Sequence, residues 1–434
     1  MDLGAGALKQ DALTHAGAAV GVRMGMDSAN KPLRVFITVA DVSGDHHAAE
    51  LAKSLRELDP SIIIEGHGGS AMRAAGVQIY HDTVAKAVML VRAVVRGFEF
   101  WRLIRWTRRH YLQNRPDLHI CIDSSGINLH FAKMARSVGV PVLYYIAPQL
   151  WASREYRIKK VQRFVNRVAC ILPFEEPYYR GFGVDATFVG HPLFDELPKN
   201  RMAAPQPVEF TPQRPPVIGL MPGSRRAEVR ANFPHMLNVL KRIREKYPGV
   251  VVEIPTTPPT HDLVQQLAAG HGPIRIEQNA LDAMAPRWDF CLAKSGTTTL
   301  HLAAYGVPMI VVYRVTKLAW HAVGRWFVKI PSFALVNILA ERAATQQGKP
   351  PRRIVPEFMP WNGSDEPVAK LAIEMLQNVT RRLDQRNNLL KVAASLDQPG
   401  ASLRTAQIAI DMMQQSRAAG VVGPVAKQFD SEGV

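Results

Sequence analysis

Two successive sets of short β-rich runs, each run followed by a helical stretch, restrict the fold of this chain most strongly. Strand–helix–strand repeats of this kind build parallel sheets that are covered by helices. We therefore expect an α/β fold with two Rossmann-like domains. The expected strands are 34–39, 62–65, 118–122, 140–146 and 168–172 in the first set, and 217–221, 250–254, 274–277, 290–293 and 309–312 in the second.

A proline-rich passage separates the two sets and includes Pro205, Pro207, Pro212 and Pro215. Such a passage is typical of an interdomain linker, and 434 residues are more than one domain usually holds. The expected organisation is a flexible N-terminal extension over 1–31, a first Rossmann-like domain over 32–200, a linker over 201–216, a second Rossmann-like domain over 217–365, C-terminal helices over 366–415 and a tail over 416–434.

The composition indicates a folded protein with anionic partners. Hydrophobic residues make up 47% and charged residues 21%, which excludes a wholly disordered chain. Lys and Arg number 53 against 37 Asp and Glu, which favours nucleic acid, acidic lipid headgroups or phosphorylated substrates as partners. Cys121, Cys170 and Cys291 lie in expected strands without metal-ligand spacing, so we interpret them as core residues in a reducing compartment. We find no secretory signal and no apolar stretch long enough to span a membrane, so we expect a cytoplasmic protein.

A basic and aromatic stretch over 92–115 holds seven arginines and one acid, Glu99. Mixed arginine and tryptophan suit the membrane interface, where rings lie among headgroups and guanidinium groups pair with phosphate. RNA binding and a half-buried helix with a solvated basic side are the alternatives, because the apolar residues do not form one clean face. The residues expected to contact a membrane are Phe98, Trp101, Arg102, Arg105 and Trp106.

Two turns predict a binding site for a diphosphate. Each follows an expected strand and opens a helix, where free backbone N–H groups favour anions. Glycine lets the backbone approach a ligand, and Arg225 offers a bidentate fork. An ordinary strand–helix turn with a solvated arginine is the alternative. No G-x-G-x-x-G fingerprint follows the first strand, which disfavours hydride transfer. The predicted site residues are Gly223, Ser224, Arg225, Ser295, Gly296 and Thr297.

Several motifs occur in the order found in the lipid-A-disaccharide synthase family. They are SGD at 43–45, Ile122-Asp123 with Asn128, YIAPQLWA at 145–152, LPFE at 172–175, VGHP at 189–192, PGSRRAEV at 222–229 and KSGTTTLHLA at 294–303. Over residues 34 to about 385 the chain resembles a diverged member of that family. The chain departs from the family pattern at Asp41, Leu90, Gly126, Ser153, His301 and Pro360.

The resemblance implies a GT-B fold and a hexosyltransferase of lipid A and lipopolysaccharide biosynthesis. Such an enzyme joins UDP-2,3-diacylglucosamine to 2,3-diacylglucosamine 1-phosphate (lipid X), inverts the anomeric carbon and releases UDP. The first domain would take the acceptor lipid and the second the UDP-sugar. No metal, no other cofactor and no nucleic acid is implied. Both substrates are lipids, which implies peripheral attachment to the inner membrane.

Asp123 is the expected catalytic base, because a carboxylate at the end of a central strand can face an acceptor hydroxyl. The alternative is a carboxylate that caps the helix near Asn128. Asp41, Ser43, Asp45 and Asn128 are expected to orient the sugars, with helix capping as the other role of the two aspartates. His301 and Asn337 are expected near the nucleotide, with Glu341 nearby and core or cap roles as alternatives. Trp151 and Trp320 line acyl or sugar surfaces or belong to the core.

Two other classes of function stay open. A different GT-B enzyme, such as a UDP-sugar epimerase or a transferase of peptidoglycan precursors, would share the phosphate turns without the basic aromatic stretch. A non-enzymatic lipid-binding or RNA-binding protein would need that stretch without the paired turns.

Overall fold

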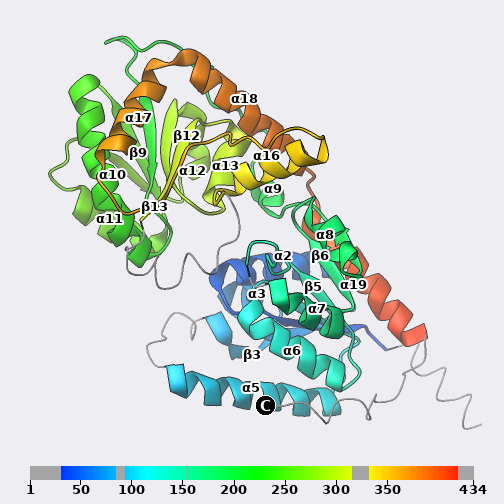
Figure 1. Cartoon of the computed structure of the whole chain (residues 1–434). Helices are drawn as coiled ribbons and strands as arrows, with labels where there is room; N and C mark the ends of the chain where they lie inside the picture. Colours follow the sequence, from blue (N-terminus) through cyan, green and yellow to red (C-terminus); the bar gives the residue numbers. More distant parts are fainter. Residues whose placement is uncertain (1–30, 85–92, 154, 315–331, 419–434) are drawn as a thin grey trace, which may run out of the picture. The chain divides into compact units, whose positions relative to one another are not determined.

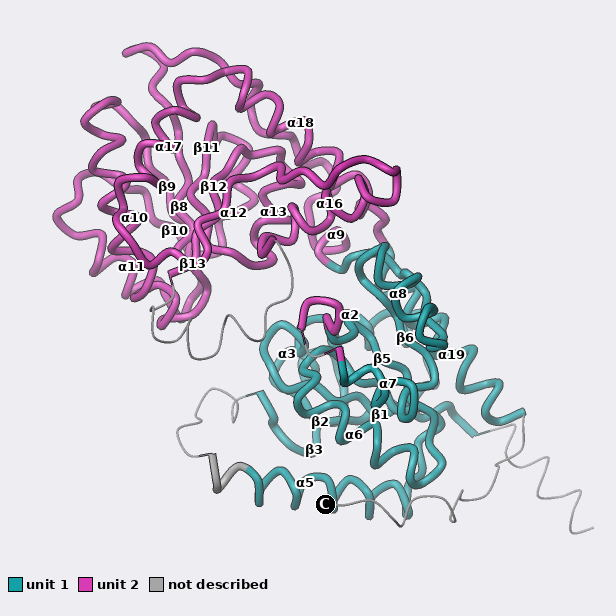
Figure 2. Tube along the Cα trace, viewed as in Figure 1, with its two compact units in different colours: residues 1–148, 156–192, 400–434 teal, residues 149–155, 193–399 magenta. Residues whose placement is uncertain are grey.

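The computed structural model describes residues 31–84, 93–153, 155–314 and 332–418 (Figure 1). The expected extension over 1–31 therefore lies almost wholly outside the described residues, as do Leu90, Trp320 and the end of the tail. The chain forms two compact units (Figure 2). In described residues, unit 1 takes residues up to 148, 156–192 and 400–418, and unit 2 takes 149–155 and 193–399.

Unit 1 is built on a parallel seven-stranded sheet in the order β3-β2-β1-β4-β5-β6-β7. The strands are β1 (Arg34–Thr38), β2 (Ile63–Gly68), β3 (Gln78–Asp82), β4 (Leu118–Ile122), β5 (Val142–Tyr145), β6 (Arg167–Cys170) and β7 (Ala186–Phe188). Every residue of β4 is buried, as expected of a strand with helices on both sheet faces.

Helices cover this sheet, and one of them comes from the far end of the chain. They are α2 (Val42–Leu58), α3 (Ser70–Ala74), α5 (Ala93–Gln113), α6 (Ser125–Ser137), α7 (Ile158–Phe164), α8 (Glu175–Gly181) and α19 (Ala401–Ala418). Helix α19 packs against α2, and the Arg417 guanidinium binds the Asp117 carboxylate with N–O distances of 2.7 and 2.9 Å. The C-terminal helix is thus an integral part of the N-terminal unit.

Unit 2 holds a parallel six-stranded sheet in the order β10-β9-β8-β11-β12-β13. Its strands are β8 (Val217–Met221), β9 (Val251–Thr256), β10 (Arg275–Gln278), β11 (Phe290–Lys294), β12 (Met309–Arg314) and β13 (Glu357–Trp361). Its helices of four or more residues are α9 (Leu193–Glu196), α10 (Arg226–Lys246), α11 (His261–Ala268), α12 (Leu281–Met284), α13 (Thr298–Tyr305), α16 (Leu335–Gln346), α17 (Glu366–Gln377) and α18 (Val379–Leu396). Apolar residues of β8, β9, β11 and β12 pack against α10 and α17 to form the core on one side of the sheet.

All ten strands expected from the sequence are present, and β3, β7 and β13 are additional. The three cysteines are fully buried, and burial raises the pKa of each thiol, as expected of core residues. None of the described helices combines the length and the apolar character needed to cross a bilayer.

Candidate active site

Two aspartates lie close together where neighbouring strands β1 and β4 end in unit 1. Asp41 precedes helix α2, and its Oδ1 accepts a hydrogen bond from the Gly44 amide at 2.7 Å. The Ser124 hydroxyl donates to the other oxygen, Oδ2. Ser124 is the residue after Asp123, so one short link joins the two strand ends and places both carboxylates in one region.

The backbone at Asp123 is held in an unusual conformation. Asp123 and Ser124 have φ values of 50° and 44°, in the left-handed region that side chains other than glycine rarely adopt. Buried side chains hold this turn: Asn128 Nδ2 donates to the Asp123 carbonyl at 2.9 Å, and the Tyr144 hydroxyl donates to the same carbonyl at 2.6 Å. Strain that is maintained in this way is common at functional sites.

The environment of Asp123 suits a base. Burial raises the pKa of its carboxyl group, and the charge of Asp41 raises it further, while the Ser124 amide opposes the shift by donating to Oδ1. A carboxylate with a raised pKa is a stronger base, which favours proton transfer from a hydroxyl group.

The other expected acceptor residues differ in what they can reach. Asp45 is 3% exposed, and its carboxylate accepts the amides of Gly69, Ala71 and Met72 at 2.7–3.3 Å. Asn128 is fully buried and bonded to backbone carbonyls at this edge. Both side chains are therefore occupied in fixing the strand ends, whereas Ser43 is exposed and shares a hydrogen bond of 3.3 Å with His47.

In unit 2, the two glycine-containing turns follow the neighbouring strands β8 and β11. Gly223 and Gly296 have φ values of 129° and 156°, which require glycine. Ser224 is exposed, and the Arg225 side chain is 78% exposed. Adjacent parallel strands end at the same sheet edge, so the turns offer amide groups and an unburied guanidinium in one region.

Sequence reasoning missed a carboxylate and a cation that connect these turns. Glu228, in the first turn of α10, accepts a hydrogen bond from the Ser224 amide at 3.2 Å and from the Lys294 ammonium group at 3.0 Å. Arg225 Nη1 lies 3.4 Å from the same carboxylate. The side chains of Glu228 and Lys294 are only 11% and 17% exposed. A carboxylate of the chain itself therefore already binds donors at the two turns that would suit an anionic ligand.

His301 is anchored by an acid of helix α12. Its Nε2 lies 2.6 Å from Asp282 Oδ1, which also accepts from the Tyr305 hydroxyl at 2.7 Å. The hydrogen bond with His301 lowers the pKa of the Asp282 carboxyl. The imidazole is thus held in a fixed orientation close to the second turn.

Asn337 and Glu341 fill structural positions. Asn337 is fully buried, donates to the Val355 carbonyl at 2.9 Å and accepts the amides of Ile354 and Val355. Glu341 Oε1 accepts from the Ser332 hydroxyl at 2.6 Å. These bonds match the core and cap alternatives, since Asn337 attaches helix α16 to the segment before β13 and Glu341 attaches it to Ser332, which precedes the helix.

Helix α5 presents only part of the basic and aromatic stretch. Phe98 and Trp101 are 62% and 51% exposed, with the guanidinium carbon of Arg102 5.8 Å from the Phe98 ring centre and that of Arg105 4.4 Å from Trp101. Trp106 differs, because its ring packs on His81, Tyr80 and His110 with centroid distances of 4.6–5.2 Å. Trp106 is thus partly buried in the packing between α5 and the sheet, and its contact with a membrane stays a prediction. Trp151 is buried.

Within the described part of the chain, no group of three or more His, Cys, Asp or Glu side chains is placed to hold a metal ion.

Two parallel α/β units with glycine-containing turns at the strand ends define the GT-B class. Solved structures similar to this chain share the fold at low sequence identity. A UDP-GlcNAc 2-epimerase from Neisseria meningitidis matches with a TM-score of 0.53 and 11% identity, covering 88% of this chain and 100% of the other. MurG from Acinetobacter baumannii matches with a TM-score of 0.51 and 16% identity, covering 88% of this chain and 100% of the other. CalG4, the calicheamicin glycosyltransferase, matches with a TM-score of 0.52 and 13% identity, covering 88% of this chain and 99% of the other.

A family model for lipid-A-disaccharide synthetase matches residues 35–410. Curated relatives named lipid-A-disaccharide synthase include those of Geobacter metallireducens, 34% identical over 389 residues, and Nitrosococcus oceani, 34% identical over 387 residues. These matches cover 88% of this chain and 98% and 96% of the relatives. The chain belongs to the lipid-A-disaccharide synthase family, and it is a glycosyltransferase of lipid A biosynthesis.

Proposed function

We propose that this protein joins UDP-2,3-diacylglucosamine to 2,3-diacylglucosamine 1-phosphate, forming the lipid A disaccharide 1-phosphate and UDP. Unit 1 takes the acceptor lipid and unit 2 the UDP-sugar. The observation that carries the proposal is the partly buried Asp123 carboxylate at the end of β4, with its raised pKa, in a chain of this family.

In the proposed reaction, Asp123 removes the proton of the attacking acceptor hydroxyl. The hydroxyl oxygen forms a bond to the anomeric carbon of the donor while the bond to the UDP oxygen breaks, which inverts the configuration. The proton stays on Asp123 until solvent takes it, and the electron pair of the broken bond leaves with UDP. Asn128 and Tyr144 act as positioning residues, because they fix the backbone that carries Asp123.

Charge that develops on the leaving diphosphate needs fixed positive groups. We assign this role to Arg225, the amides of the turns at Gly223–Ser224 and Ser295–Thr297, and Lys294. Preorganised donors and charges of this kind are effective because they need no reorganisation during the reaction. The bond between Glu228 and Lys294 holds the ammonium group beside both turns before the donor binds.

The lipid nature of both proposed substrates requires contact with a membrane surface. The exposed rings of Phe98 and Trp101 and the guanidinium groups of Arg102 and Arg105 supply that contact on helix α5. We therefore propose peripheral attachment to the inner membrane from the cytoplasmic side.

The test is UDP release by the purified full chain with both lipid substrates, compared with UDP-N-acetylglucosamine alone. We expect UDP and a disaccharide product only when both lipids are present, with turnover at least a hundredfold lower for Asp123→Asn. Formation of an epimerised UDP-sugar without an acceptor would instead favour the epimerase alternative. UDP release that is unchanged in Asp123→Asn would remove the proposed base.

A further inference from the structure

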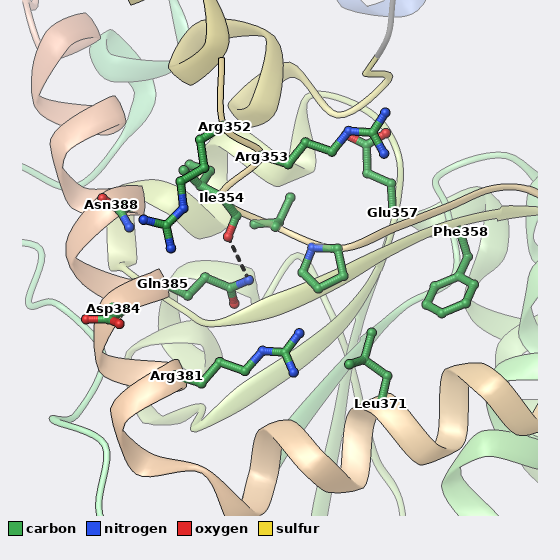
Figure 3. Close-up of a pocket in the computed structure, with 12 residues that line it drawn as sticks. Arg352, Arg353, Ile354, Glu357, Phe358, Leu371, Arg381, Asp384, Gln385 and Asn388 are labelled. Atoms are coloured by element: carbon green, nitrogen blue, oxygen red, sulfur yellow. Dashed lines mark hydrogen bonds between the residues drawn. The ribbon is translucent and has the colours of Figure 1, made fainter. Parts of the chain in front are cut away.

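A cavity of about 450 Å³ lies in unit 2 beside the segment that leads into β13 (Figure 3). The sheet is parallel, so this cavity lies at the amino-terminal edge of β13, whereas the turns after β8 and β11 lie at the carboxyl-terminal edge. It is therefore separate from the proposed nucleotide site. It is lined by Arg352, Arg353, Ile354, Val355, Pro356, Glu357, Phe358, Leu371, Arg381, Asp384, Gln385 and Asn388.

Gln385 connects the elements that surround this cavity. Its Oε1 accepts the amide of Met309 at the start of β12 at 2.7 Å, and its Nε2 donates to the Ile354 carbonyl at 3.0 Å. These bonds fix helix α18 to the sheet and to the segment before β13. Arg381, Asp384, Gln385 and Asn388 follow a helical spacing, so they share one face of α18.

Two guanidinium groups of the lining form no ion pair with any of the described residues. No carboxylate of the described residues forms an ion pair with Arg352 or Arg381, and Figure 3 shows both side chains extending on either side of Gln385. Arg353 is engaged elsewhere, with its Nε donating to the Ser332 hydroxyl at 3.1 Å. Both residues are exposed, so their guanidinium donors remain open to an anion.

The lining holds two carboxylates, Glu357 and Asp384, against its three guanidinium groups. The Glu357 carboxylate is occupied by the amides of Phe333 and Ala334, at 2.9 and 3.1 Å, and by the Asn337 side chain. Asp384 is exposed on α18 and is the one lining carboxylate left without such donors among the described residues. Hydrogen bonds from amides leave the Glu357 carboxylate charged, so the three guanidinium groups and two carboxylates of the lining leave one excess positive charge.

Two further arginines lie behind this face of α18. Arg386 is 8% exposed and donates to the Ala204 carbonyl at 3.1 and 3.3 Å. Arg382 is fully buried and donates to the carbonyl oxygens of Met375 and Val208. Carbonyl groups satisfy these hydrogen bonds without neutralising the charge, so the helix adds positive potential near the cavity.

We propose that this cavity binds a phosphomonoester group, with Arg352 and Arg381 as its two guanidinium partners and the Asn388 amide as a further polar contact. Guanidinium groups match the oxygens of phosphate in a bidentate manner. The volume falls within the lower part of the range for small-molecule sites. Val355, Pro356 and Leu371 supply an apolar wall for the organic part of the ligand. This inference does not depend on the reaction proposed above.

Calorimetry with the full chain and inorganic phosphate tests the proposal. The background carries Arg225→Gln, so that the turns after β8 and β11 contribute as little as possible. We expect binding at one site, an affinity at least tenfold weaker in Arg352→Gln/Arg381→Gln, and a tighter complex in Asp384→Asn, which removes the opposing carboxylate. The matched control is Arg242→Gln/Lys246→Gln, which removes two exposed positive charges at the far end of α10 and should bind phosphate as before.

A second arm uses vesicles of phosphatidylcholine with and without phosphatidic acid, which carries the same phosphomonoester on a lipid. Loss of phosphate binding in Arg352→Gln/Arg381→Gln supports a soluble ligand. Loss of binding to phosphatidic acid vesicles alone supports a lipid headgroup. Equal binding by this variant and its parent in both arms, or equal loss in the matched control, overturns the proposal. Thermal unfolding of each variant verifies that the unit is still folded.

Discussion

Replacement of Asp123 by asparagine should separate stability from activity. The burial and the nearby Asp41 charge that raise the pKa of Asp123 also make its ionised form unfavourable in the folded protein at neutral pH. Asparagine keeps the shape and removes the charge. We therefore expect Asp123→Asn to raise the free energy of unfolding by up to about 1 kcal/mol, within the range typical of stabilising substitutions. Loss of a general base should lower kcat by about 10²–10⁴-fold, or about 3–5 kcal/mol in the activation free energy.

The pH dependence of that stability difference follows from the direction of the shift. A carboxyl group whose pKa is raised on folding binds protons more tightly in the folded state, so it favours folding most at low pH. Its contribution is lost as pH rises from the ordinary value of 3.8 through the folded pKa. The advantage of Asp123→Asn over wild type should therefore be full at neutral pH and should vanish below about pH 4.

Asp45→Asn is the matched control, because it makes the same chemical change at a carboxylate that backbone amides stabilise through hydrogen bonds. Asp45 accepts three backbone amides, and an asparagine can turn only one oxygen toward them. We expect it to lower the free energy of unfolding by about 1–3 kcal/mol while the folded fraction keeps its turnover. Urea unfolding and UDP release measure both quantities. A destabilised Asp123→Asn, or one that keeps a tenth of wild-type kcat, would refute the reasoning.

Three further outcomes follow from the same structure. Arg225→Gln should raise KM for the UDP-sugar and lower kcat, each by several-fold or more, because the exposed guanidinium group would contact phosphate in the ground state and the transition state. Unchanged kinetics would show that Arg225 is a solvated residue without substrate contact. Trp101→Ser should weaken co-sedimentation with anionic vesicles at all salt concentrations and Arg105→Gln mainly at low salt, with no change in Tm; equal binding by both variants and wild type would contradict membrane contact. Burial lowers the pKa of His67 well below 6.5 and that of His119 to about 3, so both histidines take up protons on unfolding at mildly acidic pH. The urea midpoint of unfolding should therefore fall as pH drops from 7.5 to 5, and should fall less in His119→Gln. A midpoint that does not change with pH would contradict this.

The sequence predicts most of the sheet framework, because buried parallel strands consist of short apolar runs between turn residues. Strand β4 is an example, with five buried residues between Asp117 and Asp123. Strand β3 was missed because Gln78–Asp82 is polar and lies at a sheet edge. Strand β13 was missed because Pro360 lies within it, and an edge position tolerates proline.

Contacts between distant segments were beyond reach of the sequence. Trp106 lies within the same run as the exposed Trp101, and only the side of α5 on which each residue falls distinguishes them. The return of α19 to unit 1 includes its packing on α2 and an ion pair between Arg417 and Asp117, which are 300 residues apart. No periodicity within either segment indicates that pairing.

The expected site residues divide according to how many of their polar atoms are already bonded. Asp45 accepts three backbone amides, and both the oxygen and the nitrogen of the Asn337 side chain are bonded within the chain, so these residues have little capacity left to hold a substrate. Arg225 makes a single long contact and stays exposed, and so keeps most of its donors. Glu228 lies between these cases. Its carboxylate binds the Ser224 amide and the Lys294 ammonium group, which are the same kinds of donor that a diphosphate would use. Removing this carboxylate would leave the ammonium group beside the turns less ordered but free of a competing anion, so the effect of Glu228→Gln on donor affinity reports which of these two consequences is larger.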